Sequence, residues 1–403
     1  MARRVVVTGM GGICATGANV AEFWANSRNG ACGIVERTVG PSDDLSVTTP
    51  MAPVDGFEAR AADLGRDAQR ADRFTQFAIA AAEEALANSG AAIDDALSAR
   101  TAAIIGTGIG GQKTSDESYY AMMRQGRRPH PLSILKVIAN APASHLAIRF
   151  GARGPAFAVS SACASGAHAI GVCADLIRSG AADQGFAGAA EAVLTYGALN
   201  SWKVMHIMSD ELCRPFSKNR KGLVIGEGAG VLFLEEYERA KARGAQIHAE
   251  IVGFGMNADG KDMINPDVKG AAAAIRLALT NVRVADPAGV YINAHGTGTL
   301  LNDPTETKAI REVFGADADA LIVSSTKSMH GHLLGAAGGI EAIAAIMALK
   351  EGIAPPTINY DEPDPACDLD YAPNEAKERK FDLALSNSFA FGGLNAVLAF
   401  AKV

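Results

Sequence analysis

The sequence predicts an α/β protein whose strands are mostly buried between helices. Short apolar runs rich in valine and isoleucine alternate with helical patterns along the chain, as in layered α/β folds. Glycine makes up 43 of the 403 residues and clusters beside these runs, although its usual share is about 7%. Glycine clusters at strand ends indicate tight turns into helices, and functional residues often lie on such turns.

The first half of the chain begins with a strand and then alternates helix and strand. We expect strands at residues 3–10, 101–108 and 154–162, and helices at residues 73–90 and 165–180. Both helices end at a glycine, which is the residue that most readily adopts the left-handed C-cap conformation.

The second half repeats this alternation. We expect a strand at 249–258, strands that run into loops at 289–299 and 320–332, and two strands within 381–403, with helices at 269–282, 302–314 and 336–352. Each half has a strand that runs into a polar segment of small residues, "VSSACASG" in the first and "VSSTKS" and "LSNSFAFGG" in the second. The repetition predicts an internal duplication, with an N-terminal half at 1–250 and a C-terminal half at 251–403.

Composition excludes several classes of protein. A net charge of -7 argues against a general nucleic-acid binder, because phosphate contacts need a basic surface. No apolar run reaches the roughly 20 residues that cross a bilayer, and the N-terminal segment has no signal-peptide core, so we expect a soluble cytoplasmic protein without a membrane partner. The six cysteines are scattered without paired spacing, which argues against a disulfide framework or a zinc ribbon.

Two short motifs suggest sites that the rest of the sequence does not support. "GTGIGG", Gly106 to Gly111, matches a dinucleotide-binding pattern, but no second strand ending in an acidic residue about 20 positions later accompanies it. Tight packing is therefore favoured, and a nicotinamide oxidoreductase is a minor alternative. His330 and His332 in "MHGH" could form a metal pair, but a catalytic zinc normally has three protein ligands, so we expect no metal.

Cys163, in "SSACASGAH", lies where a strand becomes a helix. Small neighbours would let a substrate approach, and the amides and positive dipole end of the helix would favour a thiolate. A free cysteine can equally pack as a small buried hydrophobe, and the local sequence favours neither interpretation. We expect the nearest histidine, His168, to pack or hydrogen-bond locally.

Distant residues shift the balance toward chemistry at Cys163. His295 and His332 both follow apolar strands and lie in loops rich in small residues, and Lys327 shares the second loop. Two histidines and a lysine at strand ends, together with a cysteine, form the residue set of an acyl-transfer site. The histidines can donate hydrogen bonds to a carbonyl oxygen as negative charge develops on it.

Five ordered motifs extend over nearly the whole chain: "SSACASGAHAIG", "RPFSKNRKGLVIGEGAG", "NAHGTGTLLNDPTE", "SSTKSMHGHLLGAAGGIEA" and "SNSFAFGGLNAVLAF". Together they resemble the β-ketoacyl-[acyl-carrier-protein] synthases of the elongating type II kind, including relatives in rhizobial nodulation-factor synthesis. The resemblance implies the thiolase fold, in which two similar halves stack as five α-β-α-β-α layers, usually in a homodimer.

The resemblance also implies catalytic roles for the matched positions. Cys163 takes the place of the acyl-accepting cysteine, and His295 and His332 take those of the two catalytic histidines. Lys327 matches the family lysine and Glu306 its acidic partner, and both would organise the histidine site.

Four further positions match the substrate side of the family site. Phe391 matches the gating phenylalanine, whose amide, with that of Cys163, would form the oxyanion hole. Thr297 and Thr299 match positions that hold the pantetheine arm, and Ile109 resembles a position at the acyl pocket.

The implied reaction has two stages and needs neither metal nor cofactor, because its substrates are carried on phosphopantetheine. An acyl chain passes from an acyl carrier protein to Cys163; malonyl carrier protein then loses carbon dioxide, and the resulting carbanion attacks the acyl-cysteine. Acyl carrier proteins are acidic, so docking needs a local basic region. The candidate docking residues, each of which could equally be an ordinary solvated charge, are Arg66, Arg70 and Arg73 in one segment and Arg124, Arg127 and Arg128 in another.

Some positions depart from the family pattern. His330 stands where a small residue such as threonine is usual, Ala390 and Leu394 replace the glycine and threonine of the gating turn, and "LLND" and "DMINP" also differ. These changes bear on the substrate more than on the reaction. We expect a 3-oxoacyl-[acyl-carrier-protein] synthase of fatty-acid elongation; the alternative is a specialised synthase for nodulation-factor, very-long-chain or polyketide acyl chains. A non-catalytic chain-length factor is disfavoured, because its hallmark is replacement of the cysteine.

Overall fold

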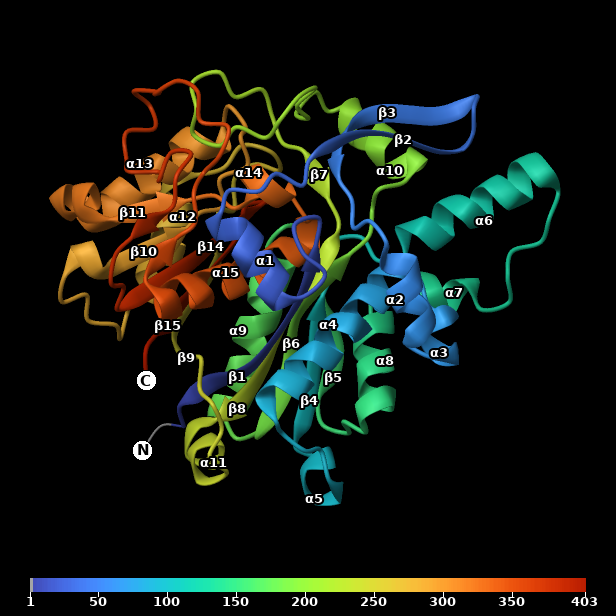
Figure 1. The fold of residues 1–403 in the computed structure, drawn as a ribbon, viewed down its shortest axis with the longest axis horizontal. Coiled ribbons are helices and arrows are strands. Elements are labelled where there is room, and N and C mark those ends of the chain that lie inside the picture. The colour runs from blue at the N-terminus through green and yellow to red at the C-terminus, as the bar shows by residue number, and fades with distance from the viewer. Residues whose placement is uncertain (1–2) are drawn as a thin grey trace.

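A long mixed sheet runs through the computed structural model, which describes residues 3–403 (Figure 1). Among these residues ten strands are joined in the order β11-β10-β14-β15-β9-β1-β8-β6-β4-β5. Five come from residues 5–236: β1 (Val5–Cys14), β4 (Thr101–Gly106), β5 (Ala156–Val159), β6 (Gln184–Glu191) and β8 (Gly228–Glu236). The other five come from residues 249–401: β9 (Ala249–Ala258), β10 (Val290–Asn293), β11 (Ile322–Ser324), β14 (Leu383–Ala390) and β15 (Leu394–Ala401).

The two halves of this sheet have the same topology. β4 is parallel to both β5 and β6, as β10 is parallel to both β11 and β14. The remaining pairs, β6–β8–β1 and β14–β15–β9, are antiparallel in both halves. The halves meet where β1 pairs with β9 through Val6↔Glu250 and Val7↔Ala249. This equivalence confirms the predicted duplication and the thiolase-type α/β fold.

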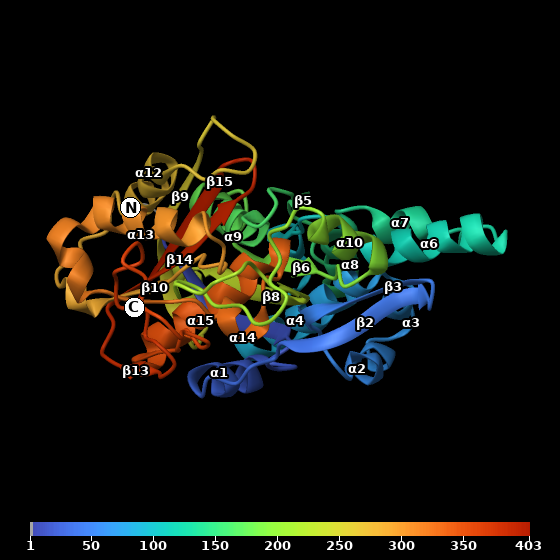
Figure 2. The same ribbon diagram turned by 90° about the horizontal axis from the view of Figure 1, so that it is seen from above.

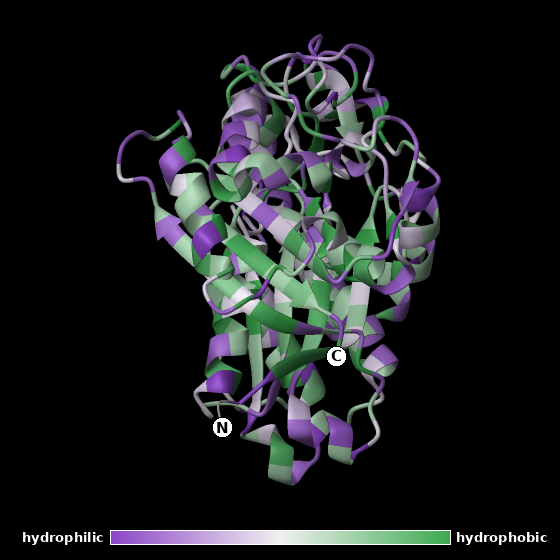
Figure 3. Ribbon diagram, turned by 90° about the vertical axis from the view of Figure 1, so that its left-hand side faces the viewer, coloured by the Kyte–Doolittle hydropathy of each residue, from purple (hydrophilic) through white to green (hydrophobic). Residues whose placement is uncertain are grey.

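Helices form the other layers (Figures 1 and 2). α9 (Ser165–Arg178) and α15 (Ala337–Glu351) pack against each other and against strands of both halves. α4 (Arg73–Ser89) and α8 (Ala141–Phe150) pack on the first half of the sheet, and α12 (Val268–Ala278) packs on the second half and against α13 (Asn302–Phe314). Strands and central helices are accordingly the most hydrophobic parts of the ribbon (Figure 3).

The central helix α15 is buried from Ala337 to Leu349. A helix that contacts protein on every side is expected to be apolar all round, and the run "AGGIEAIAAIMAL" has one charged residue, Glu341. Glycine lets this helix approach the sheet, because a Cβ on Gly339 would lie 2.4 Å from the carbonyl oxygen of Gly230 in β8.

Several predicted elements are confirmed at their ends. α13 spans the expected residues 302–314 and β9 the expected residues 249–258. α4 begins after Asp72, whose side chain accepts a hydrogen bond from the Phe74 amide, and ends at Gly90 with φ 61°. At 320–332, where a strand running into a loop was expected, the strand β11 ends at Ser324 and part of the expected loop is a short helix, α14 (Lys327–His330).

Other elements lie between these. Within residues 3–403 they are α1 (Val20–Arg28), β2 (Val35–Ser42), β3 (Leu45–Ala52), α2 (Phe57–Asp63), α3 (Arg66–Gln69), α5 (Asp95–Ser98), α6 (Gln112–Gln125), α7 (Ser133–Val137), α10 (Tyr196–Lys203), β7 (Ile225–Gly226), α11 (Tyr237–Ala242), η1 (Pro287–Gly289), η2 (Gly315–Ala320), η3 (Leu334–Ala336), β12 (Ile353–Ala354) and β13 (Lys377–Glu378). No helix of residues 3–403 is long and apolar enough to cross a membrane.

Candidate active site

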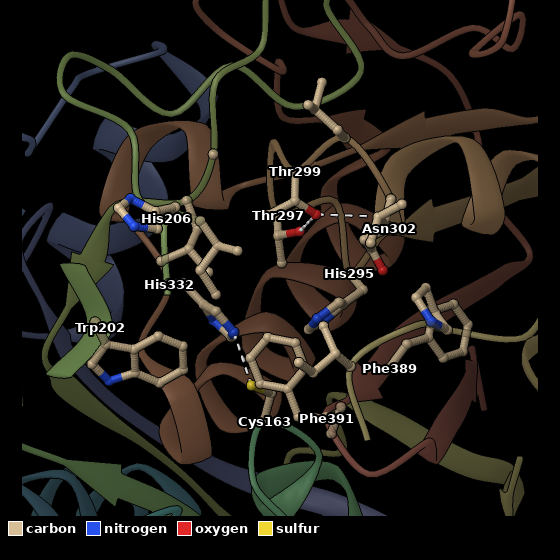
Figure 4. A pocket seen from close by; sticks show the side chains of 18 of the residues that line it. Cys163, Trp202, His206, His295, Thr297, Thr299, Asn302, His332, Phe389 and Phe391 are labelled. Atoms are coloured by element: carbon tan, nitrogen blue, oxygen red, sulfur yellow. Dashed lines mark hydrogen bonds between the residues drawn. The ribbon is translucent and has the colours of Figure 1, made fainter. Parts of the chain in front are cut away.

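The predicted catalytic residues follow the carboxyl ends of parallel strands. Cys163 follows β5 at the start of α9, His295 follows β10, and His332 follows β11. Phe391 lies in the turn between β14 and β15. Parallel strands in α/β folds commonly present functional loops at this edge, and the duplication brings the loops of both halves together around one cavity (Figure 4).

Cys163 is 6% exposed and faces a histidine. Its Sγ lies 3.1 Å from Nε2 of His332, as the dashed line in Figure 4 marks. The residue before it, Ala162, has φ 49°, a left-handed conformation that costs a non-glycine residue roughly 1–3 kcal/mol and is often found at functional turns. The turn therefore presents the sulfur in a fixed direction at the beginning of α9.

Backbone hydrogen bonds hold His332 in place. Its amide donates to the Val224 carbonyl at 2.6 Å, and its carbonyl accepts from the Gly226 amide at 2.9 Å. Its ring lies 5.4 Å from that of His295, at an interplanar angle of 84°. The two imidazoles thus approach the cavity at right angles.

Glu306 fixes the turn that carries His295. Its Oε1 accepts the His295 amide and its Oε2 accepts the Gly296 amide, each at 2.8 Å. The side-chain amide of Asn387 donates to Oε1 at 3.0 Å. Glu306 is therefore bound by the backbone of the histidine loop, although the family resemblance implied that it would be the acidic partner of Lys327.

The carboxylate that pairs with Lys327 is Glu341 of α15. Lys327 Nζ donates to Glu341 Oε1, and both side chains are fully buried. Burial, followed by the charge of Lys327, lowers the pKa of both His295 and His332 well below its usual range. Both imidazoles are therefore neutral at physiological pH.

Cys163 is a thiol in this environment. Burial raises its pKa to about 12, and the charges of Glu191 and Glu341 act in the same direction, while Lys327 opposes them. The expectation that the helix dipole would favour a thiolate is wrong for this closed site, because loss of hydration outweighs it. A neutral His332 beside the protonated Cys163 can accept the thiol proton as the sulfur attacks.

The cavity has a volume of about 240 Å³. Thr297 and Thr299 line it and hydrogen-bond to each other, Oγ1 to Oγ1, at 2.9 Å. Phe391 also lines it and stacks on Trp202 of α10. At its outer end lie exposed apolar side chains from the two segments with unusual sequences: Ile264 of "DMINP" and Leu300 and Leu301 of "LLND".

Ile109 is placed differently from the expectation. Its side chain is 46% exposed, and it is absent from the residues that line this cavity. Its amide faces the buried carboxylate of Glu191 at 3.3 Å, so the turn directs the side chain outward. Within this chain, Ile109 is not part of the Cys163 cavity.

His330 and His168, the other two histidines of these motifs, do not line the cavity, whereas His206 does. His330 is buried and its Nδ1 donates to the Gly331 carbonyl at 2.8 Å, while its ring lies 6.1 Å from that of Phe23. His168 contacts the Ser161 hydroxyl at 2.8 Å, as expected of a locally bonded residue. No group of three histidine, cysteine or acidic side chains among residues 3–403 is arranged to hold a metal ion.

The candidate docking arginines fall into two groups. Arg66, Arg70, Arg127 and Arg128 are exposed on α3 and on the connection after α6, and have no carboxylate partner among residues 3–403. Arg73 is different, because it pairs with Glu227 at 2.8 Å and Glu58 at 3.0 Å and its side chain is only 16% exposed. Arg124 pairs with Asp44 at 2.6 Å. Arg73 is a structural residue rather than part of a docking surface.

Sequence reasoning missed several residues of the site, among them Trp202, Glu191 and Glu341. Glu341 had a visible signal, since it is the one acid within an apolar run. Glu191 had a weaker one, because it ends an apolar strand next to small residues. Trp202 had none, because its contact with Phe391 joins segments far apart in the chain.

Comparisons with known proteins agree with this geometry. Residues 2–240 match the model of the beta-ketoacyl synthase N-terminal domain, and residues 248–361 match that of the C-terminal domain. "Nodulation protein E" of Rhizobium sp. (strain N33) is 44% identical over 100% of both chains. "3-oxoacyl-[acyl-carrier-protein] synthase 2" of Synechocystis sp. is 41% identical over 99% of this chain and 98% of its own.

A solved structure has the same fold. It is described as a type II PKS acyl-carrier protein in complex with its ketosynthase bound to the hexaketide, and it superposes with a TM-score of 0.89 at 33% identity, covering 100% of both chains. The cysteine and histidine cavity, the duplicated sheet and these relatives lead to one assignment: the chain belongs to the beta-ketoacyl synthase family of condensing acyltransferases.

Proposed function

We propose that this protein is a 3-oxoacyl-[acyl-carrier-protein] synthase that lengthens acyl chains by two carbons in fatty-acid elongation. The observation that carries the proposal is the 3.1 Å contact between Cys163 Sγ and His332 Nε2, with His295 at a right angle in the same cavity. A nucleophile and two neutral imidazoles are the groups that acyl transfer and enolate formation need.

The first stage loads Cys163. Its Sγ attacks the carbonyl carbon of an acyl thioester while His332 Nε2 takes the thiol proton. The tetrahedral oxyanion is held by the amides of Cys163 and Phe391, neither of which donates a hydrogen bond to another residue within 3–403. The carbon–sulfur bond to phosphopantetheine then breaks, and the departing sulfur takes the proton from His332.

The second stage forms the new carbon–carbon bond. Once exchange with water has moved the ring proton of the neutral His332 from Nδ1 to Nε2, the Nε2–H groups of His295 and His332 donate to the thioester carbonyl of the malonyl group, so that loss of carbon dioxide leaves a stabilised enolate. Its carbon attacks the acyl carbonyl on Cys163, and the bond to Sγ breaks. One proton taken from water restores the Cys163 thiol, and the 3-oxoacyl product stays on the carrier protein.

We also propose that the protein acts as a homodimer in the cytoplasm and receives its substrates from an acyl carrier protein. β5 ends the sheet with an unpaired edge, and its Phe157 is 40% exposed; such edges readily pair with another strand. α6 has no buried side chain and extends away from the body of the molecule (Figure 1). A second copy of the chain would cover both features. The four unpaired arginines support docking of an acidic carrier.

Mass spectrometry of the protein tests the function directly. After incubation with a panel of acyl carrier proteins, we expect one acyl group on Cys163, and none in Cys163→Ala. Cys163→Gln should release carbon dioxide from malonyl carrier protein without condensing it. Cys32→Ser is the matched control, because Cys32 is exposed and lies outside the cavity. Normal condensation by Cys163→Ala would overturn the assignment.

A second candidate function is a specialised synthase for nodulation-factor, very-long-chain or polyketide acyl chains. The 44% identity to "Nodulation protein E" over the full length favours it, as do the apolar residues Leu300 and Leu301 at the cavity mouth. The same experiment separates the candidates, because an enzyme of fatty-acid elongation would be loaded fastest with ordinary saturated chains of medium length. Preferential loading of very long, polyunsaturated or polyketide chains would identify the specialised enzyme.

A further inference from the structure

A buried carboxylate occupies the glycine-rich turn that follows β4. Glu191, the last residue of β6, is fully buried. Its Oε1 accepts the Thr107 hydroxyl at 3.0 Å and the Ile109 amide at 3.3 Å, and its Oε2 accepts the Gly108 amide at 2.6 Å. Consecutive amides in such a turn form a nest for an anion. In "GTGIGG" that anion is the protein's own side chain, which a dinucleotide phosphate would have to displace.

The same carboxylate reaches the second half of the protein. The Gly335 amide donates to Glu191 Oε2 at 3.0 Å, and Gly335 lies three residues after His332. Between them, Leu334 has φ 47°. A leucine keeps this left-handed conformation only where its surroundings hold it. The bond from Gly335 to Glu191 is one of the contacts that hold the strained segment beside His332.

Close packing around Glu191 leaves little freedom. A Cβ on Gly335 would lie 2.2 Å from the Gly108 nitrogen and 2.6 Å from Glu191 Oε2. On the other side of the turn, a Cβ on Gly106 would lie 2.5 Å from the carbonyl oxygen of Ser165, the first residue of α9. The turn after β4, the start of the helix behind Cys163, and the segment after His332 therefore meet around one carboxylate.

We propose that Glu191 is a positioning residue of the condensing reaction, which fixes the segment of His332 and the glycine-rich turn relative to Cys163 through four hydrogen bonds. The role rests on the proposed function of Cys163, and it assigns to "GTGIGG" a purpose other than cofactor binding. Burial raises the pKa of Glu191 itself to about 7. Above that pH its negative charge has a second effect, since it adds to the burial that raises the pKa of Cys163 and so helps to keep the sulfur protonated until His332 takes the proton.

Glu191→Gln tests both effects, because glutamine keeps the shape of the side chain and removes its charge. Acyl transfer from a carrier protein should slow about tenfold or more in kcat with little change in KM, since misplaced catalytic groups lower the rate more than the binding. In a Cys32→Ser background, the pH midpoint for alkylation of Cys163 by iodoacetamide should move to lower pH by roughly one unit.

Glu235→Gln is the matched control. Glu235 is an equally buried glutamate of β8, which accepts the Thr8 hydroxyl at 2.6 Å and Arg243 Nε at 2.9 Å. In the register of β6 and β8, Glu235 lies opposite Gln184, at the other end of β6 from Glu191, which lies opposite Gly228. Glu235→Gln should lower stability without moving the alkylation midpoint or kcat. If Glu191→Gln and Glu235→Gln behave alike, Glu191 is only a structural residue.

Thr107→Val distinguishes the positioning effect of Glu191 from the effect of its charge. It also replaces Glu191→Gln as the test if that variant does not fold. It removes one donor to the carboxylate and leaves the charge, so transfer should slow while the alkylation midpoint stays in place. If Glu191→Gln does not fold, an unchanged rate of acyl transfer in Thr107→Val would overturn the proposal. A wild-type protein that no carrier acylates would instead contradict the proposed function, and the alkylation midpoints would still report the influence of Glu191 on Cys163.

Discussion

Trp202 stacks on Phe391 at the edge of the Cys163 cavity, with ring centroids 6.1 Å apart and planes 24° apart (Figure 4). Trp202 belongs to α10 and Phe391 to the turn after β14, so the contact joins the two halves of the protein beside the nucleophile. Gly392 follows with φ 82° and its amide donates to the Met263 carbonyl at 2.9 Å. These contacts define one closed position of Phe391.

Trp202 should report acylation of Cys163. The protein has two tryptophans, so Trp24→Phe leaves Trp202 as the single emitter. An acyl chain on Cys163 needs space beside Phe391 and should separate the stacked rings, which changes the fluorescence of Trp202. Trp202→Phe is the control, because its remaining Trp24 is buried and lies outside the cavity. Full acylation of Trp24→Phe with unchanged emission would contradict the prediction.

Lys327→Met should strongly destabilise the protein. It leaves Glu341 as an unpaired buried carboxylate, which typically costs about 3–5 kcal/mol in the free energy of unfolding. The double variant Lys327→Met/Glu341→Met should recover much of this loss, because apolar side chains replace the pair. The double variant should nevertheless be inactive at low pH. Without the charge of Lys327 the pKa of His332 rises, and a protonated His332 cannot take the thiol proton of Cys163. Urea unfolding and pH–rate profiles measure the two effects. Equal destabilisation of the single and double variants would argue against the ion pair.

His330 should make the protein sensitive to acid. Burial, followed by the charge of Lys327, lowers its pKa from 6.5 to about 3. The folded state therefore binds fewer protons than the unfolded state between these values, and stability is lost as the pH falls below 6.5. Between pH 7 and pH 5 this group removes about 2 kcal/mol.

His330→Thr should reduce that difference, whatever its effect on stability at pH 7. Urea unfolding at the two pH values measures it. Exposed His130→Thr is the control and should retain the wild-type difference. An unchanged difference in His330→Thr would show that other groups govern the acid response.

Reversal of Arg127 and Arg128 to glutamate should weaken carrier docking. KM for carrier-bound substrates should rise roughly tenfold, because attraction to an acidic partner becomes repulsion. Attack on a small acyl thioester should continue at the normal rate. The control Arg283→Glu/Lys308→Glu changes the net charge equally on other exposed residues of the second half. Equal losses on carrier-bound and small substrates would contradict a docking role.

Regular elements with strong hydrophobic periodicity were predictable from sequence. α13 and β9 match their expected bounds, because buried faces impose the period of the structure on the sequence. The hairpin β2–β3 and helix α6 were not predicted. Most of β2 is exposed, and α6 has no buried side chain. Without a face turned to the core, these segments carry little periodic signal.

The sequence by itself determined the alternation of strands and helices, the duplication, and the residue types of an acyl-transfer site, because local patterns and ordered motifs encode them. Only the tertiary structure decided which groups meet. It brought the expected His332 to 3.1 Å from Cys163, paired Lys327 with Glu341 rather than with Glu306, and filled the turn of "GTGIGG" with Glu191. Such contacts join residues that are far apart in the chain. Burial sets the charge states of these residues, and they are buried only once both halves are packed.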